Sequence, residues 1–410
     1  MRSWPCSRRI AWQRDNGQMP ILASKADVLR LRLESHGLSA PRLDGPRAVV
    51  ERLLAIQAQD LPAASWALGV RSPGTTAADV TAALDAGSIV RSYPLRGTLH
   101  LLPAEDVRWM LDLTAPRILS SIQTRQRQLS LTPGMVEAAG EAAVGLLSGG
   151  RQLSRTPFFA GLQAAGIDTD GQRGYHLILA LSLTGLLVWG PTVDGQPALA
   201  LLDEWAPEQR RLDRAQGLAE FLVRYLDGHG PASLRDFTWW SQLTVADAKS
   251  ALAEAGSRVE EIEIDGAKLL LSAAAERGEL GRKPAQRTPV FALPGFDEYL
   301  LGYRDRSYVI DDSDFPRVVP GLNGIFLPLI VSGGRVVGTW RKETVRNRRS
   351  GTTVTVEPTA FESLSARRRT AFDGAIREYA AFTGLTTKTT STTPTSTART
   401  AQPAGAGTIS

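Results

Sequence analysis

The sequence contains very little cysteine and histidine: Cys6 is the single cysteine among 410 residues, and only four histidines occur. One cysteine excludes a disulfide framework and a cysteine-ligated metal site. The histidines, His36, His100, His176 and His229, are far apart in the sequence, so a histidine-rich metal site is not expected either. We therefore predict a protein that uses neither a metal ion nor a cofactor.

Long apolar runs are also missing. No stretch of 18 or more apolar residues occurs, so no membrane-spanning helix is expected. The first nine residues are basic, but no long apolar segment follows them, which argues against a signal peptide. Met19 precedes the first periodic segment, and translation from Met19 would leave residues 1–18 outside the protein. We predict a monomeric, cytoplasmic protein without membrane association.

Size and charge leave several functional classes open. A length of 410 residues exceeds the usual size of a single hydrophobic core, which favours two or three domains. Hydrophobic residues at 43% and charged residues at 22% are typical of a globular protein. A net charge of +5 is compatible with nucleic acid as a partner without requiring one.

Two glutamines in the N-terminal part form the first candidate site. Apolar residues recur at helical spacing from Ala48 to Gln57, which predicts the last turns of a buried helix. Pro62 then directs the chain out of that helix, so Gln57 and Gln59 are expected where a helix ends and a loop begins. Glutamine is no strong general base, but its amide can orient a water or a leaving group. Alternatively, both amides cap backbone groups at a crowded helix end.

A predicted β-hairpin supplies further polar groups. Two β-prone segments flank the neighbourhood of Pro94 within Ile89–Pro103, and side chains alternate along the second segment. Arg96, Thr98 and His100 lie in this hairpin, and we expect them beside the glutamines. His100 has the alternative role of a hydrogen-bonded histidine on a sheet face. Helices are predicted on either side of the glutamines, at Ser24–Ser35 and Thr76–Asp85.

The middle of the chain twice shows the order helix, turn, helix and β-hairpin, which is typical of a winged-helix module. The first occurrence runs from Leu153 to Pro191. The second runs from His229 to Leu271, and Asp265-Gly266 is a strong two-residue turn signal between its last two strands. The two stretches share no long sequence identity, so we interpret them as alike in architecture only.

The C-terminal part is predicted to be rich in β-structure, with a closing helix at Ser363–Phe382. Strands are expected at Phe291–Phe296, Tyr308–Asp311, Gly324–Val331, Arg335–Trp340 and Thr352–Glu357. The densest basic stretch follows Trp340, and it contributes Arg341, Lys342, Arg346, Arg348 and Arg349 as candidates for contacts with phosphates. The alternative is a solvated strand end and loop.

These patterns divide the chain into five parts. They are an N-terminal segment outside the fold (1–22), a winged-helix-like region with the glutamines (23–206), a second winged helix (207–285), a β-rich domain with a closing helix (286–383) and a disordered Thr- and Ser-rich tail (384–410).

Four blocks together resemble one protein family. They are Leu54–Asp60 (LAIQAQD), Leu95–Leu101 (LRGTLHL), Phe296–Tyr303 (FDEYLLGY) and Val336–Trp340 (VVGTW). Their sequences and order are similar to those of the AlkZ-like winged-helix family of alkylpurine DNA glycosylases. The resemblance implies an α+β fold with tandem winged-helix domains and a C-terminal, barrel-like β domain, arranged in a C shape around double-stranded DNA.

The resemblance also implies a role for the glutamines. The family motif is glutamine, a hydrophobic residue and glutamine, and Gln57-Ala58-Gln59 matches it with a small central residue. Gln57 and Gln59 would then position a water for hydrolysis of the N-glycosidic bond of N3- or N7-alkylated purines, including those in interstrand crosslinks. Such a base already carries a positive charge and leaves as a neutral species, so weak catalytic groups suffice.

Other residues of the four blocks would assist this reaction. Asp60 would add negative charge near the sugar cation, or cap the following loop. Arg96, Thr98 and His100 would shape the site. Because no lysine nucleophile is indicated, the resemblance implies a monofunctional hydrolase without lyase chemistry.

Two other functional hypotheses fit the same modules. One is a non-enzymatic winged-helix DNA-binding protein, either a regulator or a lesion-binding protein, which would bind duplex DNA without releasing a base. The other is a protein-interaction module whose winged helices never contact DNA.

Overall fold

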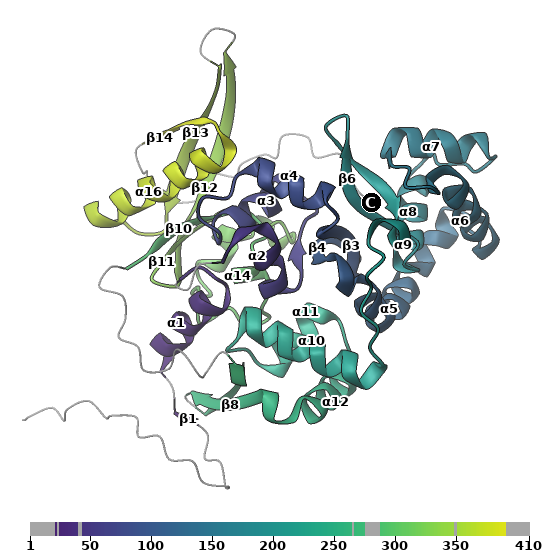
Figure 1. The fold of residues 1–410 in the computed structure, drawn as a ribbon. Coiled ribbons are helices and arrows are strands. Elements are labelled where there is room, and N and C mark those ends of the chain that lie inside the picture. The colour runs from purple at the N-terminus through teal and green to yellow at the C-terminus, as the bar shows by residue number, and fades with distance from the viewer. Residues whose placement is uncertain are drawn as a thin grey trace, which may run out of the picture.

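The computed structural model describes residues 21–22, 24–39, 43–264, 266–274, 288–347 and 351–390. Within these residues the chain is an α+β structure with three β-sheets (Figure 1). Most of the predicted N-terminal segment and the end of the predicted tail, residues 391–410, lie outside the described residues. None of the described helices is both long and apolar enough to cross a membrane.

The N-terminal part alternates short helices and strands. Its elements are β1 (Ile21–Leu22), α1 (Lys25–Ser35), α2 (Gly45–Leu53), β2 (Ile56–Gln57), α3 (Leu61–Gly69), α4 (Ala77–Asp85), β3 (Ile89–Leu95) and β4 (Thr98–Pro103). Ser24 and Thr76 each accept a hydrogen bond from the third residue of the helix that follows, in complete capping boxes. The helices predicted at both places and the hairpin of β3 and β4 are therefore confirmed.

The next part carries the first predicted helix–turn–helix–hairpin order. Its elements are η1 (Ala104–Asp106), α5 (Val107–Gln128), α6 (Pro133–Leu147), β5 (Leu153–Ser154), α7 (Arg155–Ala164), α8 (Arg173–Leu183), β6 (Leu187–Val193), β7 (Gln196–Leu201) and α9 (Leu202–Trp205). Strands β6 and β7 join the N-terminal strands in a six-stranded sheet of order β2-β4-β3-β6-β7-β5. The hairpin after α8 is thus continuous with the strand that carries the first glutamine.

The second helix–turn–helix–hairpin order follows directly. After α10 (Arg214–His229), it consists of α11 (Leu234–Ser241), α12 (Val245–Ala255), η2 (Gly256–Arg258), β8 (Val259–Ile264) and β9 (Ala267–Ser272). The strands align Ile264 with Ala267, as the two-residue turn signal predicts. Rather than joining the large sheet, β8 pairs with β1 in a separate three-stranded sheet.

The C-terminal part forms a curled half-barrel sheet of order β10-β11-β12-β13-β14. Its elements are β10 (Val290–Leu293), α14 (Glu298–Leu301), α15 (Phe315–Val318), η3 (Pro320–Leu322), β11 (Leu329–Ser332), β12 (Arg335–Asn347), β13 (Gly351–Ala360), α16 (Ala366–Thr383) and β14 (Thr386–Thr389). In Figure 1 the β12–β13 hairpin projects from the body, with α16 beside it.

Three predictions for the C-terminal part are wrong. The strand expected at Gly324–Val331 begins only at Leu329, after an exposed loop. No strand forms at Tyr308–Asp311, where backbone turns close on Arg306 instead. The predicted tail does not begin at Gly384, because β14 pairs in parallel with β13 and extends the sheet. Its threonines are β-branched and therefore suited to a strand, a preference that the Thr- and Ser-rich composition concealed.

The hydrophobic core joins the two ends of the chain. Trp66 of α3 donates a hydrogen bond from Nε1 to the Ala292 carbonyl on β10, at 2.7 Å. Its ring also packs edge-on against Tyr379 of α16, with centroids 5.1 Å apart. Arg71, directly after α3, forms a doubly hydrogen-bonded, fully buried ion pair with Asp297, at 2.7 and 2.8 Å. The N-terminal glutamine region is thus fixed to the C-terminal sheet.

Candidate active site

The glutamine pair lies on an extended segment, so the prediction of a helix ending at the glutamines is wrong. Helix α2 ends at Leu53, and Leu54 adopts a φ of 62° and a ψ of −47°, which a right-handed helix cannot contain. The chain then forms β2, where Gln57 pairs with His100 of β4.

The reason for this difference is that the glutamine segment is buried on both sides. Leu54 and Ala55 belong to the core formed with α5 and α10, whereas Ile56 and Ala58 belong to the core shared with the C-terminal sheet. A short apolar run packed against two cores has no one-sided periodicity, and sequence alone cannot separate it from a buried helix.

Gln57 lies in the strand, whereas Gln59 lies two residues later, in the bend that follows it. Gln57 is half-buried and Gln59 is exposed. The backbone N–H of Leu99 donates to Gln59 Oε1 at 3.3 Å, which orients that amide. In the described part of the chain, no hydrogen bond involves the side-chain amide of Gln57.

Asp60 caps the helix that follows the glutamines. Its Oδ1 accepts a hydrogen bond from the Ala63 N–H at 3.0 Å, and Pro62 occupies one of the first two positions of α3. Pro62 therefore begins a helix instead of ending one, which is a position that proline favours. The exposed Asp60 carboxylate remains close to Gln59 in the chain.

Glu298, to which we assigned no role from the sequence, lies directly behind Gln57. Its Oε1 accepts a hydrogen bond from the Gln57 backbone N–H at 3.1 Å, and its Oε2 accepts one from Trp240 Nε1 at 3.0 Å. His229 Nε2 lies 3.5 Å from the same Oε2. Burial alone would raise the pKa of Glu298, but His229, whose Nε2 lies 3.5 Å away, and the charge of Arg96 outweigh it and lower that pKa to about 2. A buried negative charge therefore supports the glutamine strand from below.

The β3–β4 hairpin brings Arg96, Thr98 and His100 to this strand, as predicted. Arg96 and Gly97 both have positive φ, at 54° and 66°, as a tight two-residue hairpin turn requires. His100 is fully buried, and its Nδ1 donates to the Thr98 carbonyl at 2.8 Å, so its Nε2 accepts from Arg96 Nη2 at 3.3 Å. Burial and the charge of Arg96 lower the pKa of His100 to about 3. His100 is therefore a neutral internal support for Arg96.

Arg96 connects the hairpin to helix α11. Its Nη1 donates to the Trp240 carbonyl at 3.2 Å, and its guanidinium carbon lies 5.3 Å from the centre of the Trp239 ring. Arg306 lies against the same ring at 4.8 Å, and burial lowers the pKa of Arg306 to about 10. Trp239, Trp240 and Arg306 were not singled out from the sequence. The paired tryptophans at 239–240 were the available signal.

This geometry favours positioning of a water over proton transfer. His100 and Glu298 are buried, and each bonds only to internal partners. Gln59 and Asp60 are exposed, and Gln57, like Arg96 and Thr98, is half-buried. Two amide oxygens can hold a water and stabilise a developing positive charge, but they cannot take up a proton.

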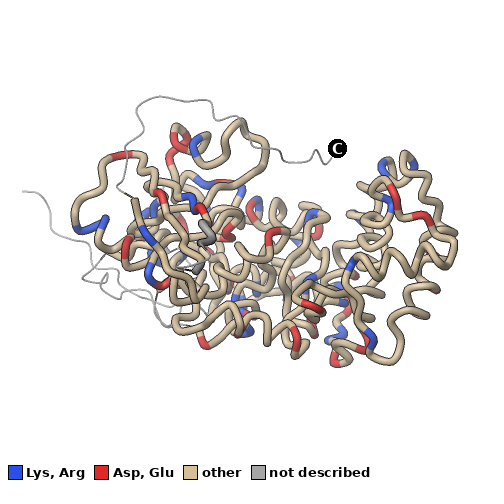
Figure 2. The backbone as a smooth tube through the Cα atoms, turned by 90° about the horizontal axis from the view of Figure 1, so that it is seen from above, with Lys and Arg blue, Asp and Glu red and all other residues tan. Residues whose placement is uncertain are grey.

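The predicted phosphate-binding residues lie on the β12–β13 hairpin, apart from the glutamines. Arg341 is exposed and pairs with Glu357 at 2.7 Å, and Lys342 Nζ donates to the Tyr379 hydroxyl at 2.8 Å. Arg346 lies on β12, but its side chain, like Arg348 and Arg349 as whole residues, falls outside the described residues. Figure 2 shows positions of Lys and Arg interspersed with those of Asp and Glu along the described backbone.

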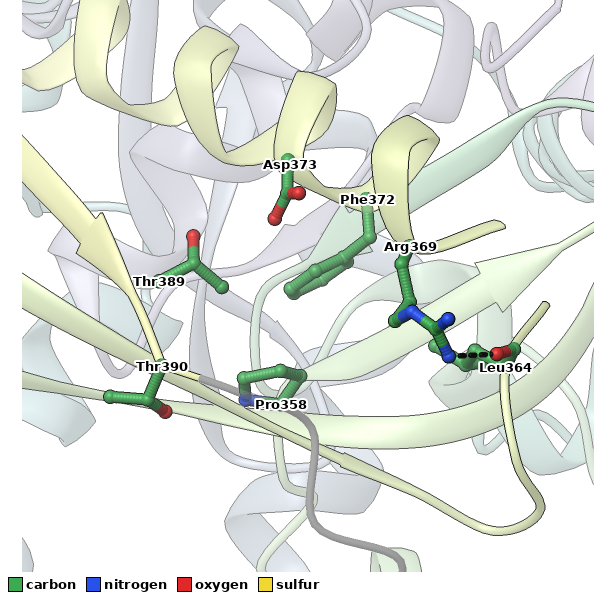
Figure 3. A pocket seen from close by; sticks show the side chains of 7 residues that line it. All are labelled: Pro358, Leu364, Arg369, Phe372, Asp373, Thr389 and Thr390. Carbon is green, nitrogen blue, oxygen red and sulfur yellow. Dashed lines mark hydrogen bonds between the residues drawn. The ribbon is translucent and has the colours of Figure 1, made fainter. Parts of the chain in front are cut away.

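A pocket of about 220 Å³ lies between α16 and the strands β13 and β14 (Figure 3). It is lined by Pro358, Leu364, Arg369, Phe372, Asp373, Thr389 and Thr390. The Arg369 guanidinium turns to the Leu364 carbonyl. The pocket shares no residue with the glutamine site. Among the described residues, no three His, Cys, Asp or Glu side chains gather where they could hold a metal ion.

Comparison with known proteins places these residues in a family. The sequence matches the family described as DNA glycosylase AlkZ-like over residues 50–382, which is most of the chain. The chain belongs to the AlkZ-like DNA glycosylase family. The matched region begins within α2 and ends within α16, so it includes the glutamine strand, the β3–β4 hairpin and Glu298.

One curated relative and one solved structure extend this assignment. The AlkZ-like chain is 25% identical over 327 residues to an interstrand DNA cross-link repair glycosylase from Streptomyces sahachiroi, with 78% of this chain and 88% of the relative covered. The fold of this chain is similar to that of the Streptomyces sahachiroi DNA glycosylase AlkZ, with a TM-score of 0.74 at 22% identity. That structural match covers 90% of this chain and all of the solved one.

Proposed function

We propose that this protein is a monofunctional DNA glycosylase that hydrolyses the N-glycosidic bond of N3- or N7-alkylated purines, with Gln57 and Gln59 positioning the water. The observation that supports this proposal is the placement of the half-buried Gln57 and the exposed Gln59 at the end of a strand whose backbone is held by the buried Glu298. The fixed backbone holds Gln57 in place while its amide stays available to orient a water.

The proposed reaction needs no strong acid or base. The alkylated base already carries a positive charge, so the bond between C1′ and the base nitrogen breaks with both electrons going to the base, which leaves neutral. The water oxygen bonds to C1′, and its proton passes to the solvent that reaches Gln59 and Asp60. The amide oxygens of Gln57 and Gln59, the Asp60 carboxylate and the buried charge of Glu298 all favour the positive sugar in the transition state.

The proposed substrate is double-stranded DNA, bound by a monomer. In this proposal the chain consists of winged-helix parts at 23–206 and 207–285 and a β-rich part from residue 286 to the end of β14, arranged in a C shape around the duplex. Phosphate contacts come from the hairpin residues Arg341, Lys342, Arg346, Arg348 and Arg349. Because the curated relative is named a cross-link repair glycosylase, interstrand crosslinks of alkylated purines are included among the proposed substrates.

The test is release of base from a duplex with a single N7-methylguanine, followed by alkaline cleavage of the abasic site. Wild type is compared with the double variant Gln57→Ala, Gln59→Ala, and duplex affinity and urea unfolding are measured for both. We expect wild type to release the base and the double variant to be at least about 10³-fold slower. Affinity and stability should stay close to those of wild type.

Other outcomes separate the alternatives. If a folded double variant released the base at the wild-type rate, Gln57 and Gln59 would have no catalytic role. Binding without release by wild type, on this duplex and on one with an N7-linked interstrand crosslink, would instead support a non-enzymatic DNA-binding protein.

A further inference from the structure

His229, the last residue of α10, contacts the carboxylate that holds the glutamine strand. Its side chain is fully buried, and its Nε2 lies 3.5 Å from Glu298 Oε2. The other carboxylate oxygen of Glu298 accepts the hydrogen bond from the Gln57 N–H at 3.1 Å. A single carboxylate therefore connects the imidazole of His229 to the backbone of the first glutamine.

The partners of His229 specify where its protons are. Its Nδ1 lies 3.2 Å from the Tyr225 carbonyl oxygen, which can only accept, so Nδ1 carries a proton. Its Nε2 faces the Glu298 carboxylate, and no hydrogen-bond partner competes for it in the described part of the chain. A neutral imidazole with its proton on Nδ1 would direct a lone pair at this carboxylate. An imidazolium, with a proton on each nitrogen, fits both partners.

The Glu298 carboxylate is ionised, as its own partners require. Both of its oxygens accept from N–H groups, one from Gln57 and one from Trp240 Nε1 at 3.0 Å. A carboxylate enclosed in this way remains charged only with a cation at hand, because burial favours the neutral acid. Of the charged side chains in the described residues, His229 is the one that forms an ion pair with Glu298.

The walls around the imidazole suit a cation. The Tyr225 ring stacks on it, with centroids 4.7 Å apart and planes inclined by 12°, and the Trp240 ring lies at 5.2 Å. The face of an aromatic ring attracts positive charge. Gly302 closes the site on another side, since a Cβ at this position would lie 2.5 Å from His229 Cδ2. The ring is thus confined to one position opposite Glu298.

The neighbouring histidine, His36, is neutral. The centroids of the two imidazoles are 5.0 Å apart. The Tyr303 hydroxyl donates to the His229 carbonyl at 2.6 Å, so it accepts from His36 Nε2 at 2.8 Å, and the buried Nδ1 of His36 has no partner. Burial and the charge of His229 lower the pKa of His36. The positive charge of this histidine pair is therefore on His229.

The other titratable groups of the cluster do not replace this ion pair. Burial raises the pKa of Tyr225, Tyr299 and Tyr303, so these tyrosines remain neutral hydroxyls. The charged or titratable side chains that act on the cluster from the surrounding elements are Arg32, Arg52, Arg71, Arg96, His100, Asp236, Asp297 and Arg335.

We propose that His229 is a positioning residue, whose imidazolium keeps Glu298 ionised and fixes its carboxylate against the Gln57 N–H. This inference rests on the proposed function. Without the cation, the buried carboxylate would take up a proton and lose the negative charge that favours the positive sugar. His229 thus acts on the reaction through Glu298 and does not touch the substrate.

The first test is the pH profile of base release at saturating protein on the N7-methylguanine duplex, from pH 6.0 to 8.5. His229→Gln removes the cation, so burial raises the pKa of Glu298. We expect the variant to be about 10²-fold slower than wild type at pH 6.0, where Glu298 is protonated. Its rate should then rise by up to about tenfold per pH unit as Glu298 ionises. Wild type should show no such rise, because its Glu298 is ionised throughout.

Two further variants separate positioning from a merely structural role. His176→Gln makes the same substitution at a half-buried histidine of α8 and should keep the wild-type rate and profile. The double variant His229→Gln, Glu298→Gln should be no slower than Glu298→Gln alone, since His229 acts through Glu298. A loss in His229→Gln that does not depend on pH, or losses that multiply in the double variant, would overturn the proposal.

A second readout does not depend on catalysis or on the folding of a variant. The chain has only four histidines, so wild type labelled with ¹⁵N-histidine gives a simple NMR spectrum at pH 7.5. We expect one imidazole with both nitrogens protonated, absent from His229→Gln and neutral in Glu298→Gln. If wild type releases no base, the proposed glycosylase function fails, and this spectrum still decides the charge of His229. A neutral His229 in wild type would overturn the inference whatever the activity.

Discussion

The glutamine site and the basic β12–β13 hairpin hold their polar groups in opposite ways. Around Gln57, the side chains of Glu298 and His100 are buried and bonded to internal partners. On β12, Arg341 and Lys342 are exposed, and Arg341 bonds across the strands to Glu357 at the surface. A group that orients a water loses rate when it shifts by about 1 Å, whereas a phosphate contact tolerates motion. This difference fits the proposed roles of the two regions, which are chemistry for the glutamine site and binding for the hairpin.

The largest expected effect is on the free energy of unfolding, when a buried ion pair is broken instead of an exposed one. Asp297→Asn leaves Arg71 buried without its charged partner, which should lower the free energy of unfolding by about 3–5 kcal/mol. Glu357→Gln removes the partner of the exposed Arg341 and should cost at most about 1 kcal/mol. Urea unfolding at neutral pH measures both. Equal losses would contradict the view that the glutamine region is held by its buried charges.

The next effect concerns the group behind Gln57. Glu298→Gln keeps the shape of the side chain but removes its charge and one of its two hydrogen bonds. Since Glu298 is buried, the variant should bind duplex DNA within about twofold of wild type and release base about 10²-fold more slowly at saturating protein. A urea unfolding curve checks that the variant is folded. Loss of affinity with an unchanged saturated rate would refute its role as a positioning residue.

Acid should weaken the glutamine region through its buried histidines. Burial lowers the pKa of His100 to about 3, and it lowers the pKa of His36 as well. Below pH about 6.5 the unfolded chain takes up these protons while the folded chain does not, so the stability is complete above that pH and is lost as the pH falls toward 3. Each histidine contributes at most about 1.4 kcal/mol per pH unit.

Urea unfolding at pH 7.5, 6.0 and 5.0 measures this slope. His100→Gln should flatten it, because the variant has no imidazole to protonate. An identical slope in wild type and variant would show that His100 does not contribute.

The smallest effects are expected on the hairpin. Arg341→Ser and Lys342→Ser should each reduce the slope of log K against log salt by about 1 and weaken binding severalfold at moderate salt. Base release at saturating protein should stay at the wild-type rate. A fall in the saturated rate would instead place these residues near the reacting sugar.

The sequence predicted most helices, the β3–β4 hairpin, both helix–turn–helix–hairpin orders and the closing helix, because caps, turn dipeptides and one-sided periodicity are local signals. It misplaced the glutamine strand, since Ile56 and its neighbours pack against two cores and lack a one-sided pattern. It misjudged Pro62, which both ends and begins helices. At both places the local structure depends on contacts between residues far apart in the sequence, which a local pattern does not show.

The support of the candidate site was missed for a similar reason. Glu298 is 241 residues from Gln57 in the sequence. Its place in the apolar run Phe296–Tyr303 indicates that its carboxylate is buried, but it does not indicate which residue hydrogen-bonds to it. Acids inside an apolar segment are seldom buried unless paired, which was the usable signal. The strand position of His100 was predictable, but its complete burial and its bond to Arg96 were not.

The most direct test of the account is the rate of base release at saturating protein, measured in a single turnover on one N7-methylguanine duplex. It is run for the Gln57→Ala, Gln59→Ala variant and for the Arg341→Ser, Lys342→Ser variant. The account predicts a loss of at least about 10³-fold in the first and none in the second. A glutamine variant as fast as wild type, or two variants equally slow, would contradict the division between a site for chemistry and a surface for binding.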